Sequence, residues 1–130
     1  MVGLVIISHS RVLAEGVAEV ARAMGVGKAV VECAGGDTGG GLGTSMDLVE
    51  RAVRAVRAAD GGGDGVVLLA DLGSSVLTAK MYAEDADGEV VLADAPLVEG
   101  AVAAASMAAT GAGLDAVVAA AESARDLRKT

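Results

Sequence analysis

The chain has 130 residues, 53% of them hydrophobic and 22% charged, so it is long enough for one domain with a core and too apolar for intrinsic disorder. Its formal net charge of −8 is opposite in sign to what binding of phosphate backbones requires, so we exclude nucleic acid as a partner. One Tyr and no Phe or Trp disfavour base-stacking RNA readers and sites that sandwich a flavin.

A single cysteine, Cys33, excludes an internal disulfide and a cysteine-based zinc site, and it suits a reducing cytosol. The first apolar run, Leu4 to Ile7, is too short to span a bilayer and lacks the basic flank and cleavage site of a signal peptide. We therefore expect a cytoplasmic protein with no membrane partner, in which residues 1–130 form one domain.

Short apolar runs alternate with longer amphipathic stretches along the chain. In chain order they predict a strand at residues 2–7, a helix at 11–24, a strand at 29–33, a helix at 46–59, a strand at 66–70, a helix from 74 or 75 to about 86, a strand at 89–92, and helices at 98–110 and 114–129. The apolar stripe expected to face the core from the first helix comprises Leu13, Val17, Val20 and Met24. This alternation is typical of an α/β fold with a parallel sheet and right-handed crossovers.

Polar side chains gather in the segments that directly follow the predicted strands, at residues 8–11, 34–45, 71–75 and 93–96. An open parallel sheet binds its ligand beyond the carboxyl ends of its strands, so we expect the functional site at this edge. Three glycines at 61–63 fall at the opposite end and are interpreted as a plain linker.

His9 is the only histidine and stands between the first predicted strand and the first predicted helix. Ser8 or Ser10 is the expected N-cap of that helix, so the imidazole would lie beside unpaired backbone N–H groups that attract an anion. An unprotonated imidazole is nucleophilic, and a phosphoryl group transferred to it would gain from the helix end. We favour this functional role over the alternative that His9 only caps or packs at the junction.

Asp71 occupies the equivalent position after the third predicted strand. If the first and third strands are neighbours, Asp71 faces His9 across a crevice, where a carboxylate bound to one ring nitrogen fixes the tautomer and leaves the other nitrogen free to attack. The alternative is that Asp71 caps the helix expected to begin at Ser74 or Ser75, or that its carboxylate accepts hydrogen bonds from loop amides. The pairing with His9 favours the first interpretation.

Residues 35–45 contain six glycines, and such a loop can bring backbone amides close to a phosphate. Thr44 and Ser45 can donate hydroxyl hydrogen bonds or cap the next helix, although most glycine-rich loops are only connections and no Lys follows here as a nucleotide-binding loop requires. Arg11 either screens the negative charge of an incoming phosphoryl group or is only a surface residue of the first helical turn. The segment 100–105 consists mostly of small residues and is a candidate for helix–helix contact and for a dimer interface.

Five motifs occur in an order that resembles one known family: Leu4-Val5-Ile6-Ile7-Ser8-His9-Ser10, Ala34-Gly35-Gly36, Gly43-Thr44-Ser45, Asp71-Leu72-Gly73-Ser74 and Ala95-Pro96-Leu97-Val98-Glu99-Gly100. They are similar to the DhaM family, the phosphotransfer subunits of bacterial phosphoenolpyruvate-dependent dihydroxyacetone kinases. The domain of that family is related to the mannose-type component IIA of the sugar phosphotransferase system (PTS). The resemblance covers essentially the whole chain.

The resemblance implies a flavodoxin-like fold, an open parallel four-stranded sheet in the order 2-1-3-4 with helices on both faces, in a homodimer. It implies that phospho-HPr, charged ultimately by phosphoenolpyruvate, phosphorylates His9, and that the phosphoryl group then passes to ADP on the nucleotide-binding subunit of the kinase. The chain would thus be a phosphotransferase component (EC 2.7.1.-) of glycerol metabolism that holds no metal or cofactor of its own. Some family members carry fused carrier domains, whereas this chain ends at Thr130, so separate carriers are expected to supply the phosphate.

The matched motifs also suggest which residues surround His9 and Asp71 and help to bind the phosphoryl group: Ser8, Ser10, Arg11, Gly35, Gly36, Thr44, Ser45, Gly73 and Ser74. A mannose-type component IIA for sugar uptake would share this chemistry with a permease as partner, but the segment 95–100 favours the dihydroxyacetone branch. A non-enzymatic receiver-like module is an alternative of another class. Receivers place paired acidic residues after the first strand, where this chain has His9 between two serines.

Overall fold

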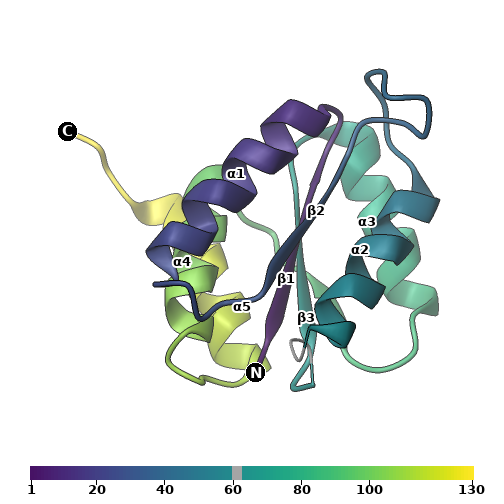
Figure 1. Ribbon diagram of the computed structural model, residues 1–130. Coiled ribbons are helices and arrows are strands. Elements are labelled where there is room, and N and C mark those ends of the chain that lie inside the picture. Colours follow the sequence, from purple (N-terminus) through teal and green to yellow (C-terminus); the bar gives the residue numbers. More distant parts are fainter. Residues whose placement is uncertain (60–62) are drawn as a thin grey trace.

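A four-stranded sheet with helices on both faces organises the chain in the computed structural model, which describes residues 1–59 and 63–130 (Figure 1). The elements are β1 (Gly3–Ser8), α1 (Arg11–Met24), β2 (Val31–Gly35), α2 (Met46–Ala58), β3 (Val66–Ala70), α3 (Gly73–Asp85), β4 (Val90–Leu92), α4 (Leu97–Ala108), α5 (Leu114–Ser123) and a short 3-10 helix at Ala124–Asp126. Two of the three glycines interpreted as a linker, 61 and 62, lie outside the described residues. The predicted alternation of strands and helices is confirmed.

The sheet order is β2-β1-β3-β4 and every pair is parallel, which confirms the predicted flavodoxin-like fold. β1 lies in the interior of the sheet and is buried along its whole length, which explains why its sequence is an unbroken apolar run. In the register, Ile7 of β1 lies opposite Ala34 of β2 and Ala70 of β3. The chain therefore leaves all three strands at the same edge, and the strand order reverses between β1 and β3 at that edge.

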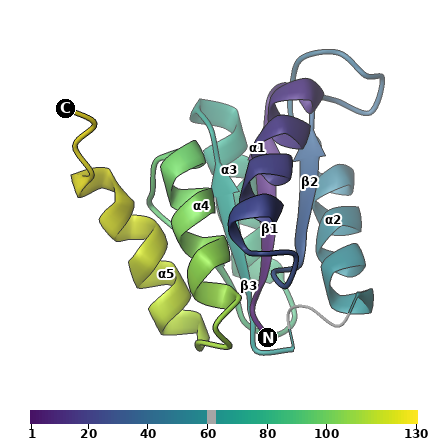
Figure 2. The ribbon, with the colours of Figure 1, turned by 60° about the vertical axis from the view of Figure 1, so that its left-hand side comes forward.

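Helices α1, α4 and α5 cover one face of the sheet and α2 and α3 cover the other (Figure 2). Alternate residues of β1 point into the two layers: Leu4 and Ile6 join the first core, Val5 and Ile7 the second. None of the helices in the described ranges is long and apolar enough to cross a membrane.

Small side chains let α4 approach the sheet closely. A Cβ on Gly100 would lie 2.9 Å from Ala95 Cβ and 3.1 Å from Leu69 Cδ2, so only glycine fits there without displacement. Ala101, Ala104 and Ala105 are fully buried within the same chain. The helix–helix contact predicted at 100–105 is therefore made within the chain, against α1 and α5, and these three alanines are not free for a dimer interface.

Two further expectations need correction. In α1, Val17 is buried as predicted, but Leu13, Val20 and Met24 are 43%, 44% and 52% exposed. The helix buries Ala14, Ala18 and Ala21 instead, because it packs so close to β2 and α4 that small residues fill the contact. The last helix ends at Ser123 rather than at residue 129, and a 3-10 turn follows it.

Candidate active site

The pairing of β1 with β3 brings His9 and Asp71 together at the carboxyl edge of the sheet. His9 follows Ser8, the last residue of β1, and Asp71 follows Ala70, the last residue of β3. The Asp71 amide donates to the Ile7 carbonyl (3.1 Å), which carries the strand pairing one step beyond β3. The His9 side chain is 32% exposed and that of Asp71 only 10%, so the imidazole is reachable from solvent while the carboxylate is held beneath it.

The Asp71 carboxylate is bound on both oxygens. Its Oδ1 lies 3.0 Å from Nδ1 of His9 and accepts the Leu72 amide at 2.7 Å. Its Oδ2 accepts the Ser8 hydroxyl at 2.8 Å and the backbone amide of His9 at 3.1 Å. The Ser8 hydroxyl in turn accepts the Ser10 amide (3.0 Å), so one buried serine links the carboxylate to the start of α1.

These contacts decide the charge of Asp71. Burial raises its pKa, but hydrogen bonds from the side chains of Ser8 and Ser75 and from the amides of Leu72 and His9 outweigh burial and lower the pKa to about 2. The carboxylate is therefore ionised at neutral pH and can only accept hydrogen bonds. It follows that in the neutral imidazole Nδ1 carries the proton, and Nε2 is the nitrogen with a free electron pair.

Two serines at the start of α3 surround the imidazole. The Ser74 hydroxyl lies 2.7 Å from Nε2 of His9, and the Ser75 hydroxyl lies 3.1 Å from Nδ1. Ser74 is exposed and Ser75 is fully buried. The expectation that one of them caps α3 is wrong: the N-cap is Leu72, no side chain caps the helix, and both serines lie inside its first turn.

Gly73 is the residue that turns the chain from the β3 edge into α3. Its φ of +33° lies in a region that L side chains rarely adopt. Together with Ser10, whose hydroxyl caps α1 by accepting the Leu13 amide at 3.1 Å, it sets the positions of the two helix ends that flank His9.

The glycine-rich loop holds the main chain of the histidine junction. The Gly36 amide donates to the Ser8 carbonyl and the Gly43 amide to the His9 carbonyl, both at 3.0 Å. A Cβ on Gly35 would lie 2.5 Å from the Arg11 Cα, so glycine is required where β2 meets the first turn of α1. In Figure 1 the loop rises above the sheet edge between β2 and α2.

The remaining predicted residues of this region bond elsewhere. Ser45 caps α2 by accepting the Leu48 amide at 3.2 Å, and the Thr44 hydroxyl accepts that of Thr78 at 3.3 Å, which ties the loop to α3. Arg11 is exposed at the first position of α1, where no described residue forms an ion pair with its guanidinium.

Sequence reasoning assigned no role to Asp37 and considered Ser75 only as a helix cap. Asp37 Oδ1 accepts the amides of Gly39 (2.9 Å) and Gly41 (2.8 Å), so its carboxylate sets the shape of the glycine loop. An aspartate just ahead of glycines is the usual signal of such a turn and could have identified Asp37. The role of Ser75 depends on where α3 begins and has no local signal.

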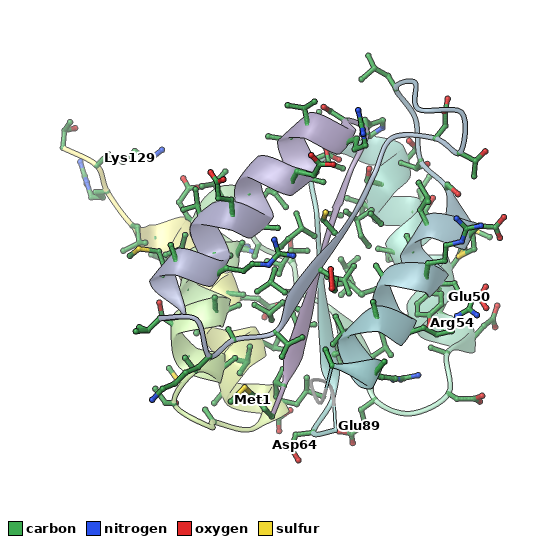
Figure 3. The ribbon with its side chains drawn as sticks, in the orientation of Figure 1. Met1, Glu50, Arg54, Asp64, Glu89 and Lys129 are labelled. Atoms are coloured by element: carbon green, nitrogen blue, oxygen red, sulfur yellow. The ribbon has the colours of Figure 1, made fainter. Side chains whose placement is uncertain are left out.

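Other charged groups lie at the opposite edge of the sheet. Figure 3 shows Met1, Asp64 and Glu89 at the amino ends of the strands, where the N-terminal ammonium bonds Asp64 at 2.6 Å. A wide hollow of about 1190 Å³ lies there, far from His9. Within the described ranges, no group of three or more His, Cys, Asp or Glu side chains is placed to hold a metal ion.

Comparison with known proteins gives consistent results. Residues 3–118 match the family model described as PTS system fructose IIA component. The chain is 38% identical over 125 residues to the phosphoryl donor subunit DhaM of the PEP-dependent dihydroxyacetone kinase of Klebsiella michiganensis, covering 91% of this chain and 26% of that protein. It is 36% identical over 104 residues to the DhaM subunit of the PEP-dependent dihydroxyacetone kinase 1 of Listeria innocua, covering 80% of this chain and 79% of that protein.

The fold is shared with a solved structure as well. A crystal structure of a protein of unknown function superimposes with a TM-score of 0.73 at 26% identity and covers 94% of each chain. The chain thus spans 26% of the length of the Klebsiella relative and 79% of the length of the Listeria relative.

Proposed function

The chain belongs to the family of PTS system fructose IIA components and to the DhaM phosphoryl donor subunits, and on this premise we propose that His9 carries a phosphoryl group between two proteins. The donor is phospho-HPr, charged ultimately by phosphoenolpyruvate. The acceptor is ADP on the nucleotide-binding subunit of a dihydroxyacetone kinase. The proposed activity is that of a phosphotransferase subunit that holds no cofactor of its own.

The observation that carries this proposal is that the two ring nitrogens of His9 have different environments. Nδ1 is held at 3.0 Å by the ionised Asp71, so Nε2 is the nucleophile. In the first transfer, Nε2 forms a bond to phosphorus while the bond from phosphorus to the donor nitrogen breaks. The ring then bears a positive charge with the proton retained on Nδ1, and Asp71 stabilises that charge without taking up the proton.

The surroundings of Nε2 suit a phosphoryl dianion. The Ser74 hydroxyl, 2.7 Å from Nε2, stands where the group will be bound, so it rotates aside and donates to a phosphoryl oxygen. The chain enters both α1, at Arg11, and α3, at Gly73, beside His9, so two helix N-termini offer partial positive charge to the anion. The exposed guanidinium of Arg11 adds to this field.

Exposure of the imidazole at the rim of the sheet supports a relay between proteins. With 32% of its side chain exposed, His9 can be reached in turn by the donor and by the acceptor. The family model named for a fructose IIA component keeps sugar uptake as a second candidate, with the same phosphohistidine and a permease as acceptor. We also propose a homodimer, whose interface does not include Ala101, Ala104 and Ala105 of α4, because these residues are buried within the chain.

Phosphorylation by phosphoenolpyruvate, enzyme I and HPr tests the proposal. We expect one acid-labile, alkali-stable adduct per chain, absent in His9→Ala and formed more slowly in Asp71→Ala. Addition of ADP-loaded kinase subunit or of a sugar permease then identifies the acceptor by loss of the adduct. An adduct that persists in His9→Ala would overturn the mechanism, and size-exclusion chromatography with light scattering reads the oligomeric state.

A further inference from the structure

Three side chains of the site stand in series across the crevice between β1 and β3. The Ser74 hydroxyl lies 2.7 Å from Nε2 of His9, and Nδ1 of the same ring lies 3.0 Å from Oδ1 of Asp71. A nucleophile within hydrogen-bond reach of a base that a third group orients is the arrangement of a serine hydrolase, which is recognised by geometry and roles rather than by chain order.

The direction of each hydrogen bond follows from the charge of Asp71. Because its carboxylate is ionised, Asp71 accepts the proton of Nδ1, and the unprotonated Nε2 accepts the hydroxyl proton of Ser74. The buried Ser75 hydroxyl, 3.1 Å from Nδ1, holds the ring from the α3 side. His9 is thus positioned to remove the proton of Ser74 as that hydroxyl attacks.

Ser74 is also accessible and favourably placed for an anionic intermediate. It is exposed in the first turn of α3, a 13-residue helix whose N-terminal partial positive charge stabilises an oxyanion formed there. The nearby hollow of about 550 Å³ is lined by Asp71, Val76, Lys80 and Leu92 and lies beside the carboxylate rather than at Ser74. Because Ser74 does not line this hollow, the hollow offers no binding space for a long acyl chain at the nucleophile, and the substrate class in our proposal is small esters.

We propose that Ser74 is an activated nucleophile and that the unphosphorylated protein hydrolyses small activated acyl esters. Ser74 Oγ bonds to the ester carbonyl carbon while its proton moves to Nε2 of His9, and Asp71 stabilises the imidazolium. The proton then passes to the leaving alkoxide as the ester bond breaks, which leaves acyl-Ser74 and an alcohol. Water, deprotonated by Nε2, releases the carboxylic acid and restores the serine.

The two chemistries exclude each other, because a phosphoryl group on Nε2 removes the base. This statement rests on the proposed phosphoryl relay, whereas the reactivity of Ser74 does not. Phosphorylation of His9 therefore switches the serine off, and Ser74 then serves as a donor to the phosphoryl group.

A fluorophosphonate probe tests the proposal directly. Its phosphorus bonds to Ser74 Oγ, fluoride leaves, and the proton passes through His9 to solvent, so the product is a stable adduct that tandem mass spectrometry assigns to one residue. We expect labelling at Ser74 in the folded protein and none after denaturation in urea. Labelling disappears in Ser74→Ala and is unchanged in Ser123→Ala, which removes an exposed serine at the end of α5.

The Asp71→Asn variant separates activation from mere exposure. The amide nitrogen of Asn donates to Nδ1, which moves the ring proton to Nε2, so labelling slows on the order of a hundredfold or more while circular dichroism reports an intact fold. Hydrolysis of p-nitrophenyl acetate falls in parallel, and burst kinetics report acyl-Ser74.

Three results would overturn the proposal: labelling of another residue in place of Ser74, labelling that is as fast in Asp71→Asn, or equal labelling of the protein after phosphorylation by HPr. If HPr leaves no phosphate on His9 but Ser74 is still labelled, the relay fails and the serine chemistry stands. The two hypotheses are thus decided separately.

Discussion

Acid titration of Asp71 measures how firmly its carboxylate is held beneath His9. Its pKa is lowered from 3.8 to about 2: burial alone would raise it, but the hydrogen bonds from Ser8, from Ser75 and from two backbone amides dominate. Because the Asp71 side chain is only 10% exposed, solvent screening reduces the energetic effect of these hydrogen bonds only slightly. The lowered pKa corresponds to about 2 kcal/mol of folding free energy at neutral pH.

The sign of the pH dependence follows from the direction of the shift. Asp71 has a lower pKa in the folded than in the unfolded chain, so its contribution is fully present well above pH 3.8 and is lost as the pH falls towards 2. Half of it, about 1 kcal/mol, is lost between pH 5 and pH 3. The Asp71→Asn variant has no carboxyl group to titrate, so its stability lacks this component.

Urea denaturation followed by far-UV circular dichroism suits a chain without Trp. We expect the difference in unfolding free energy between wild type and Asp71→Asn to shrink by about 1 kcal/mol from pH 5 to pH 3. The matched control is Asp85→Asn, which makes the same substitution at the exposed end of α3, where no described residue hydrogen-bonds to the carboxylate. A constant difference for Asp71→Asn, or a carboxyl ¹³C signal of Asp71 that titrates at 3.8 or above, would refute the reasoning.

Three further predictions concern packing, the loop and the carboxylate. Gly35→Ala places a Cβ against the start of α1 and lowers the free energy of unfolding by about 1–3 kcal/mol. The control Gly16→Ala has open space around the new Cβ in α1 and raises the free energy of unfolding by about 0.5–1 kcal/mol. Urea denaturation measures both. Asp37→Ala loosens the glycine loop and slows phosphohistidine formation several-fold, and Asp37→Asn, which keeps the oxygen acceptor, restores it. Ser8→Ala raises the pKa of Asp71 towards 3.8 in a ¹³C titration.

Each of these predictions has an outcome that contradicts it. Equal stability of the two glycine variants would show that the strand end has room to move. Phosphorylation of Asp37→Asn as slow as that of Asp37→Ala would show that the charge matters rather than the turn. An unchanged Asp71 titration in Ser8→Ala would remove that hydroxyl from the causes of the low pKa.

Several elements could be read from the sequence because their causes are local. The bounds of α1 (Arg11–Met24) and β3 (Val66–Ala70) agree with the predicted ranges. A serine cap and a helical period define the first, and an unbroken apolar run between polar residues defines the second. The positions of His9 and Asp71 directly after buried strands were readable for the same reason.

Other features depended on neighbours distant in the chain. The apolar stripe of α1 was misjudged because β2 and α4 approach it so closely that alanines, not the larger residues, fill the contact. Helix–helix contact at 100–105 could be predicted from its small residues, but which elements it contacts could not, because α1 and the sheet are distant in sequence.

The order of residues alone determined that a lone histidine and an aspartate each directly follow a strand and so lie at the carboxyl edge of a parallel sheet, since strand runs and helix caps are properties of short segments. That the two side chains meet depends on the pairing of β1 with β3. Only the folded chain decided which ring nitrogen of His9 is free, which serine faces it, and that Asp37 shapes the loop above. The reason is physical: the directions of side chains at an edge depend on strand register and on where α3 begins, and both are set by packing between distant segments.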